Sequence, residues 1–109
     1  MPLATMVASN KGRAGMSDLT MLKNVGKAAL ADFAILGITS TAQLASCEPD
    51  DLYLKLCHLT QQRHDPCVHD VFAATIHQAK TGEALNWWAF TATRKERMKA
   101  GTFCTLPTP

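Results

Sequence analysis

The chemistry that this sequence supports most directly is the binding of an anion at a turn between two short helices. The residues of that turn are Lys23, Asn24, Val25, Gly26 and Lys27. At the start of a helix the first backbone N–H groups lack partners within the helix, and the helix dipole also favours negative charge there. The two lysines add positive charge on either side. These residue types and their spacing therefore predict a phosphate-binding turn.

The segment around this turn has the spacing of a helix-hairpin-helix, a motif that holds nucleic-acid phosphates without reading bases. The usual pattern is Leu-Pro-Gly-Val-Gly-Pro-Lys-Thr-Ala, followed by a helix that ends in Leu-Gly-Ile. The positions that match here are Leu22, Val25, Gly26, Leu36, Gly37 and Ile38. Asn24 replaces the first glycine and keeps the turn, because asparagine tolerates a left-handed backbone. Ala28 replaces the usual lysine, so the charge has to come from Lys27.

Binding at this turn is expected to be weak and independent of base sequence. Lys23, Lys27 and the turn amides offer about two to four phosphate contacts, and non-specific affinities of this kind lie near ~10⁻⁴ to 10⁻⁶ M. A second use of the same fold stays open, because a helical hairpin can also serve as a scaffold for protein contact. The sequence therefore predicts weak DNA-backbone binding, with a protein-interaction module as the alternative.

A second candidate for chemistry is the segment 57–69, which holds two cysteines and three histidines. Such residues bind zinc in proteins, and Cys57, His64 and Cys67 could converge across a loop. The segment lacks Cys-x-x-Cys and His-x₃-His spacing, so buried thiols and solvated histidines are favoured over a metal site. Cys67 with His64 or His69 is the candidate nucleophile–base pair, and no oxyanion arrangement accompanies it. We therefore expect a protein without enzymatic activity and without a cofactor.

Two further groups of residues are candidates for binding. Trp87, Trp88 and Phe90 form an aromatic patch that could stack on unpaired bases, although closure of the hydrophobic core is the favoured role. The basic run near the end of the chain contains Arg94, Lys95, Arg97 and Lys99. Such a run is usually a solvated helix face. It becomes relevant to binding only if it lies beside the turn.

Composition and charge limit the classes of protein to consider. The chain has 109 residues, of which 47% are hydrophobic and 18% charged, and its net charge is +2. The length suits one domain, and the charge is far below that of a dedicated nucleic-acid coat protein. No run approaches the ~20 apolar residues that span a bilayer, and the first residues do not resemble a secretory signal, so we expect a cytoplasmic protein. The four cysteines are then expected to be free thiols.

The elements that must position these residues are all predicted to be helices. We expect one helical domain over residues 17–100 with the hairpin at residues 18–38, a flexible N-terminal tail over residues 1–16 and a C-terminal tail over residues 101–109. Gly26 and Gly37 bound the second helix, and Ser40 with Gln43 starts the third. Pro49 starts the fourth helix, whose buried face is expected to hold Leu52, Leu56 and Leu59. The longest helix runs from Asp65-Pro66 to Gly82, and the last has Thr91 as its cap and Gly101 as its stop. The prediction is an all-α fold, a small compact bundle of about five to six helices containing one helix-hairpin-helix.

Three blocks of the sequence, taken in order, resemble a small bacterial family, the pathogenicity-locus or mitomycin-resistance-type helix-hairpin-helix proteins. The blocks are Leu22–Ile38, then Arg63-His64-Asp65-Pro66-Cys67-Val68 with Asp70-Val71-Phe72, and then Thr81-Gly82-Glu83-Ala84-Leu85 followed by Trp87-Trp88. The resemblance runs from about Met21 to Met98. It implies DNA binding through the hairpin and carries over no catalytic residue. The hairpin is also similar to the C-terminal domain of competence-regulator proteins, which have an Asn-hydrophobic-Gly turn.

Overall fold

Helices form every regular element between residues 19 and 104, the part of the chain that the computed structural model describes. The elements are α2 (Lys27–Leu36), α3 (Thr41–Ala45), α4 (Pro49–Thr60), α5 (Cys67–Thr81), the 3₁₀-helix η1 (Trp87–Phe90) and α6 (Thr91–Ala100). Residues 19–21 are also helical and precede the turn before α2. The predicted all-α fold class is confirmed. None of the described helices has the length and apolar character needed to cross a membrane.

Local sequence signals set several helix ends. α2 begins directly after Gly26 and ends at Gly37, whose φ of +77° lies in the left-handed region that glycine adopts most readily. The Ser40 hydroxyl accepts a hydrogen bond from the backbone N–H of Gln43 at 3.2 Å and thereby caps α3. These ends agree with the predictions made from the sequence.

Two local predictions, at the start of α6 and on α4, are wrong. η1 runs directly into α6, so Thr91 is a helical residue and not a cap. Its hydroxyl donates instead to the carboxylate of Asp70 at 2.8 Å. On α4, Leu59 does not belong to the buried face, because its side chain is 48% exposed, whereas Tyr53 is buried at 1% exposure.

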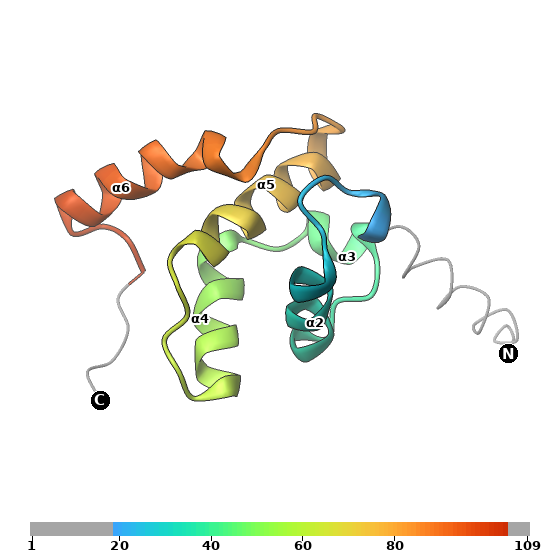
Figure 1. Cartoon of the computed structure of the whole chain (residues 1–109), viewed down its shortest axis with the longest axis horizontal. Coiled ribbons are helices and arrows are strands. Elements are labelled where there is room, and N and C mark those ends of the chain that lie inside the picture. Colours follow the sequence, from blue (N-terminus) through green and yellow to red (C-terminus); the bar gives the residue numbers. More distant parts are fainter. Residues whose placement is uncertain (1–18, 105–109) are drawn as a thin grey trace, which may run out of the picture.

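α5 is the central helix of the fold. Figure 1 shows α2 and α4 on one side of it and α6 on the other. The largest fully buried hydrophobic side chains are Phe33, Leu44, Tyr53, Leu56 and Phe72. The rings of Phe33 in α2 and Phe72 in α5 pack with their centroids 5.7 Å apart. Burial of side chains of this size stabilises the fold by about 1.5 to 3 kcal/mol each, so this core fixes α2 against α5.

The packed region continues beyond the end of α6. The ring of Phe103 lies against the rings of Tyr53 and His69, with centroids 5.8 and 4.9 Å apart. Phe103 and Cys104, which the sequence assigned to the C-terminal tail, therefore pack against the core. The rest of that tail, residues 105–109, and the predicted N-terminal tail, residues 1–16, lie outside the described residues.

The turn before α2 is held in place by the side chain of Asn24. The backbone φ of Asn24 is +74°, which confirms the left-handed conformation predicted for this residue. Its amide nitrogen Nδ2 donates to the carbonyl of Leu85 at 2.8 Å, and its Oδ1 accepts from the N–H of Trp87 at 3.1 Å. The backbone N–H of Lys23 donates to Oε1 of Gln78 at 2.8 Å. The turn is thus fixed to α5 and to the connector that leads into η1.

We expect the substitution Asn24→Ala to lower the free energy of unfolding by about 2 kcal/mol, because it removes two hydrogen bonds and leaves a β-carbon at positive φ. Asn24→Gly loses the same bonds but suits the backbone, so it should destabilise less than alanine. Urea unfolding followed by circular dichroism measures both effects. Wild-type stability in both variants would contradict the anchoring role of this side chain.

Candidate nucleic-acid interface

The structure brings the five predicted binding residues together in one turn but gives them different roles. Lys23, Gly26 and Lys27 are exposed. Val25 packs against the hydrophobic core, and the side chain of Asn24 is used by its two bonds to the connector. The groups that remain available to a ligand are therefore the two lysines and the backbone at the start of α2.

The backbone at the start of α2 presents hydrogen-bond donors. Gly26, the N-cap, has no side chain that could bond to them, and the first bond of the helix runs from the N–H of Leu30 to the Gly26 carbonyl at 3.0 Å. The N–H groups of the first turn consequently have no partner within the helix. That turn also contains no acidic residue. Together with Lys27, this helix start favours an anion.

A hollow of about 350 Å³ lies beside the helix start, between α2 and α5. Its lining is mostly apolar and includes Val68, Val71 and Phe72 of α5 with Lys27 and Asp32 of α2. Burial raises the pKa of the Asp32 carboxyl group above its ordinary value. The carboxyl group of Asp32 opposes an anion in the hollow, so the groups that favour a phosphate here are Lys27 and the backbone N–H groups at the start of α2.

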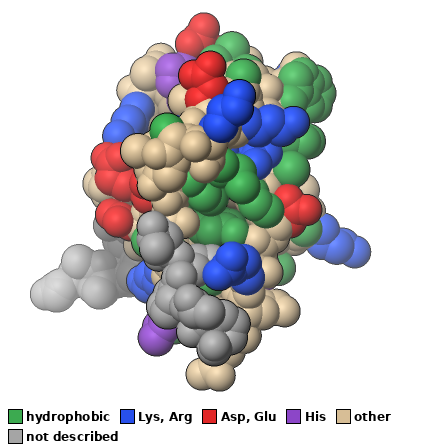
Figure 2. All heavy atoms as spheres, turned by 90° about the vertical axis from the view of Figure 1, so that its left-hand side faces the viewer, with side chains coloured by type: hydrophobic (Ala, Val, Ile, Leu, Met, Phe, Trp, Pro, Cys, Tyr) green, Lys and Arg blue, Asp and Glu red, His purple; other side chains and the backbone are tan. Residues whose placement is uncertain are grey.

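The basic run on α6 is only partly the solvated face predicted from the sequence, because Lys95 and Lys99 are exposed but the two arginines are paired. Nε of Arg94 lies 3.0 and 3.1 Å from the two oxygens of Asp70, a carboxylate with no exposed surface. Arg97 forms a second ion pair, with Asp50 at 2.8 Å. Figure 1 places the end of α6, which carries the exposed Lys99, far from the turn before α2. On the face seen in Figure 2, basic side chains are interspersed with acidic and apolar ones. This run therefore does not extend the charge of the turn.

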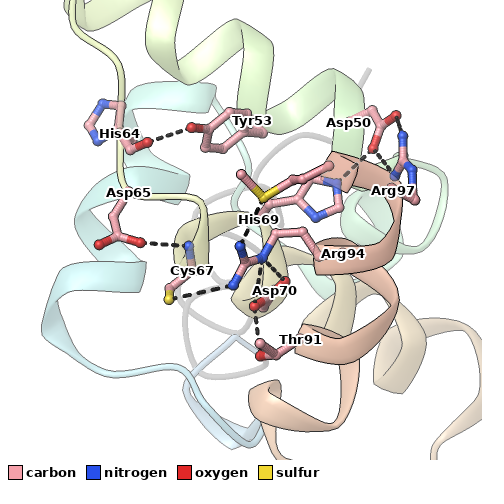
Figure 3. Close-up of polar contacts among 11 residues, drawn as sticks. Asp50, Tyr53, His64, Asp65, Cys67, His69, Asp70, Thr91, Arg94 and Arg97 are labelled. Carbon is pink, nitrogen blue, oxygen red and sulfur yellow. Dashed lines mark hydrogen bonds and ion pairs between the residues drawn. The ribbon is translucent and has the colours of Figure 1, made fainter. Parts of the chain in front are cut away.

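A polar cluster that the sequence did not predict surrounds Asp50 (Figure 3). Nε2 of His69 lies 2.6 Å from Asp50 Oδ1, and Arg97 contacts the two oxygens of the same carboxylate at 3.0 and 2.8 Å. Asp50, His69 and Cys104 place a carboxylate oxygen, an imidazole nitrogen and a thiol sulfur within 4.8 Å of one another, as no other described group of three does. These residues come from three separate segments, and no motif in the sequence indicates that they meet.

The contacts of this cluster suit a structural role better than metal binding or catalysis. The guanidinium of Arg97 occupies both oxygens of Asp50, and its positive charge opposes a metal ion at the same carboxylate. Burial, followed by the nearby Asp50 carboxylate, raises the pKa of the Cys104 thiol to about 11. A thiol with that pKa is protonated at neutral pH and is a poor nucleophile or ligand. The contacts join α4, α5, α6 and the residues that follow α6.

The cysteines and histidines between residues 57 and 69 do not converge. The Sγ of Cys57 accepts from the N–H of His64 at 3.5 Å, but the His64 ring faces the hydroxyl of Thr60, 2.8 Å from Nε2. Cys67 lies instead near Arg94, with 3.9 Å between Sγ and the guanidinium. Cys57, His64 and Cys67 therefore do not form a group of ligand atoms as close as the one around Asp50. All four cysteines are free, as predicted.

The aromatic patch of η1 is more exposed than the sequence indicated. No residue of η1 is buried, and the side chain of Trp88 is 60% exposed. The ring of Trp87 is half-buried and meets that of Trp88 edge to face, with 5.6 Å between centroids. The prediction that this patch closes the core is therefore wrong for Trp88, whereas Trp87 and Phe90 are half-buried. Because the N–H of Trp87 bonds to Asn24, the patch adjoins the turn.

The fold and the turn together define a small helical domain that presents a lysine-flanked helix start at its surface. The sequence pattern of the Cdd1 pathogenicity-locus family matches residues 12–96 of the 109 in this chain. The chain belongs to this family, as the three sequence blocks predicted. It is also 41% identical over 85 residues to the mitomycin resistance protein McrB of Streptomyces lavendulae, a match that covers 78% of this chain and 80% of that protein. No solved structure matches the chain.

Substitution of the buried pair of Asp70 and Arg94 tests how α6 is attached to α5. Removing one member of such a pair leaves an uncompensated buried charge, so we expect Asp70→Ala to lower the free energy of unfolding by about 3 to 5 kcal/mol. Asp70→Asn keeps the shape and should cost less. The exposed Asp51 is the matched control, and Asp51→Asn should change the value by less than about 0.5 kcal/mol. Equal urea midpoints for the substitutions at 51 and 70 would contradict the buried pairing.

The pair of Asp50 and Arg97 predicts a dependence of stability on pH. Hydrogen bonding from Arg97, aided by His69, holds the pKa of the Asp50 carboxyl group well below its usual range. A carboxylate whose pKa is lowered by folding contributes stability above its unfolded pKa of about 4 and loses that contribution as the pH falls through its folded value. The difference in unfolding free energy between wild type and Asp50→Asn should therefore shrink between pH 5 and pH 2. A constant difference in urea titrations across this range would refute the linkage.

Proposed function

We propose that this protein is a non-enzymatic helix-hairpin-helix domain that binds nucleic-acid backbones weakly and without sequence preference. The contact is made by Lys23, Lys27 and the first-turn N–H groups of α2. Val25 and Asn24 do not contact the ligand and instead support the turn. Val25 packs against the core, and Asn24 bonds the turn to the connector. The observation that carries the proposal is the uncapped start of α2 between two exposed lysines, held rigidly by bonds from other elements.

Two features of the turn support backbone binding in place of base reading. The donors are main-chain N–H groups, which suit phosphate oxygens, and the two lysines act as point charges. The turn carries no arginine, asparagine or glutamine side chain free to pair with a base edge, because the amide of Asn24 is already bonded on both sides. Binding of this type depends on phosphate charge and should weaken steeply with salt.

A protein-contact role for the same hairpin is the second candidate. It is favoured by the exposure of Met21, which is 79% exposed immediately before the turn. A partner held by apolar surface would stay bound as salt is raised, unlike a partner held by phosphate charge. Salt dependence of the complex therefore separates the two candidates.

Fluorescence anisotropy with a labelled 20-base-pair duplex tests the proposal. With two to four phosphate contacts, affinity should fall about 10- to 150-fold between 50 and 200 mM salt. Lys27→Glu should weaken binding at 50 mM salt by about tenfold or more, because it removes one contact and adds a repelling charge.

The matched control is Lys99→Glu, the same charge change at the far end of α6. Lys99→Glu should lower the affinity less than twofold, because Lys99 lies far from the turn. Absence of binding at low salt to the duplex and to single strands alike, or an equal loss in the two charge-reversal variants, would refute binding through the turn.

A further inference from the structure

We propose that Trp88 is a stacking platform for an unpaired base, so that the ligand of the turn is single-stranded nucleic acid. The inference rests on the proposed function, because the backbone contact at Lys23 and Lys27 would hold the strand whose base stacks on Trp88. It begins from an unusual exposure. Trp88 has 60% of its surface accessible, although tryptophan is a side chain whose burial contributes strongly to stability.

The exposed indole is held in a fixed orientation. Its ring meets that of Trp87 at 81°, with 5.6 Å between centroids, which is the favourable edge-to-face arrangement of two aromatic rings. η1 is further tied to α5, since the ring of Phe90 packs on that of His77 at 5.8 Å. A ring fixed in this way loses little conformational freedom when it stacks on a ligand.

The platform and the turn are joined by a hydrogen bond. The N–H of Trp87, one residue before Trp88, donates to Oδ1 of Asn24 at 3.1 Å. Asn24 is also the residue whose positive φ shapes the turn between Lys23 and Lys27. An aromatic side chain beside a positively charged, backbone-binding surface is the combination by which proteins hold single strands.

Charge favours a nucleic acid over an apolar protein segment at this place. The two exposed lysines of the turn lie on either side of Asn24, which is bonded to η1, and the acidic residue of the connector, Glu83, lies 2.7 Å from Nε2 of His77. Bases within a duplex already stack on each other, whereas those of a single strand expose a face to an aromatic ring. A single strand can therefore use both the lysines and Trp88, and a duplex uses the lysines alone.

The test compares a labelled 12-nucleotide oligo(dT) with a 12-nucleotide abasic strand that has the same phosphate backbone and no bases. Wild-type protein should bind oligo(dT) more tightly than the abasic strand. Trp88→Ala should lower the affinity for oligo(dT) by about 5- to 100-fold and leave that for the abasic strand within twofold. Trp88→Phe should keep much of the wild-type preference, because phenylalanine still offers a ring.

Two controls make the result specific. Leu59→Ala removes another exposed apolar side chain, on α4, and should not change either affinity. In the Trp87→Phe background Trp88 is the sole tryptophan of the chain, and its fluorescence should be quenched by oligo(dT) but not by the abasic strand.

Equal wild-type affinities for the two strands would overturn the stacking proposal and leave backbone binding intact. A self-association that Trp88→Ala abolishes, with no preference for oligo(dT), would assign the patch to protein contact and also overturn it. Absence of binding to both strands and to the duplex would refute the proposed function together with this inference.

Discussion

The position of everything around the turn depends on the side chain of Asn24. Its backbone takes a positive φ that closes the turn, while its amide reaches Leu85 and Trp87, residues that lie 61 and 63 positions later in the chain. A glycine, which the usual hairpin pattern has here, supplies the backbone conformation without this link. Asparagine at this position therefore fixes where the lysines lie relative to the exposed indole.

A second constraint acts from the first turn of α5. Asp70 has no exposed surface, and a buried carboxylate is costly unless it is paired and fully hydrogen-bonded. Its partners, Thr91 and Arg94, both come from α6. A helix with the polar sequence of α6 has little apolar surface of its own to bury, so its attachment relies on this pair and on the contact of Arg97 with Asp50.

Local features of the fold were readable in the sequence, and contacts between distant segments were not. The ends of α2 and the cap of α3 depend on residues a few positions apart, which obey known helix signals. The exposure of Trp88 and the ion pair of Asp50 with Arg97 depend on how separate helices meet. A run rich in arginine and lysine has the same pattern whether it is solvated or paired, and only the opposing carboxylates decide between the two.

The positive charges of this protein respond to ionic strength in two different ways. Arg94 belongs to a buried pair, which dissolved ions screen poorly, whereas Lys23 and Lys27 lie in solvent and are screened within about 10 Å at ordinary salt. Added salt would thus weaken the proposed contact of the turn with phosphate while the buried pair of Asp70 and Arg94 stays intact. The net charge of +2 consequently says little about binding, because part of the positive charge holds the domain together. The proposed attachment to a polyanion would then be reversed by a change of ionic environment while the folded domain stays intact.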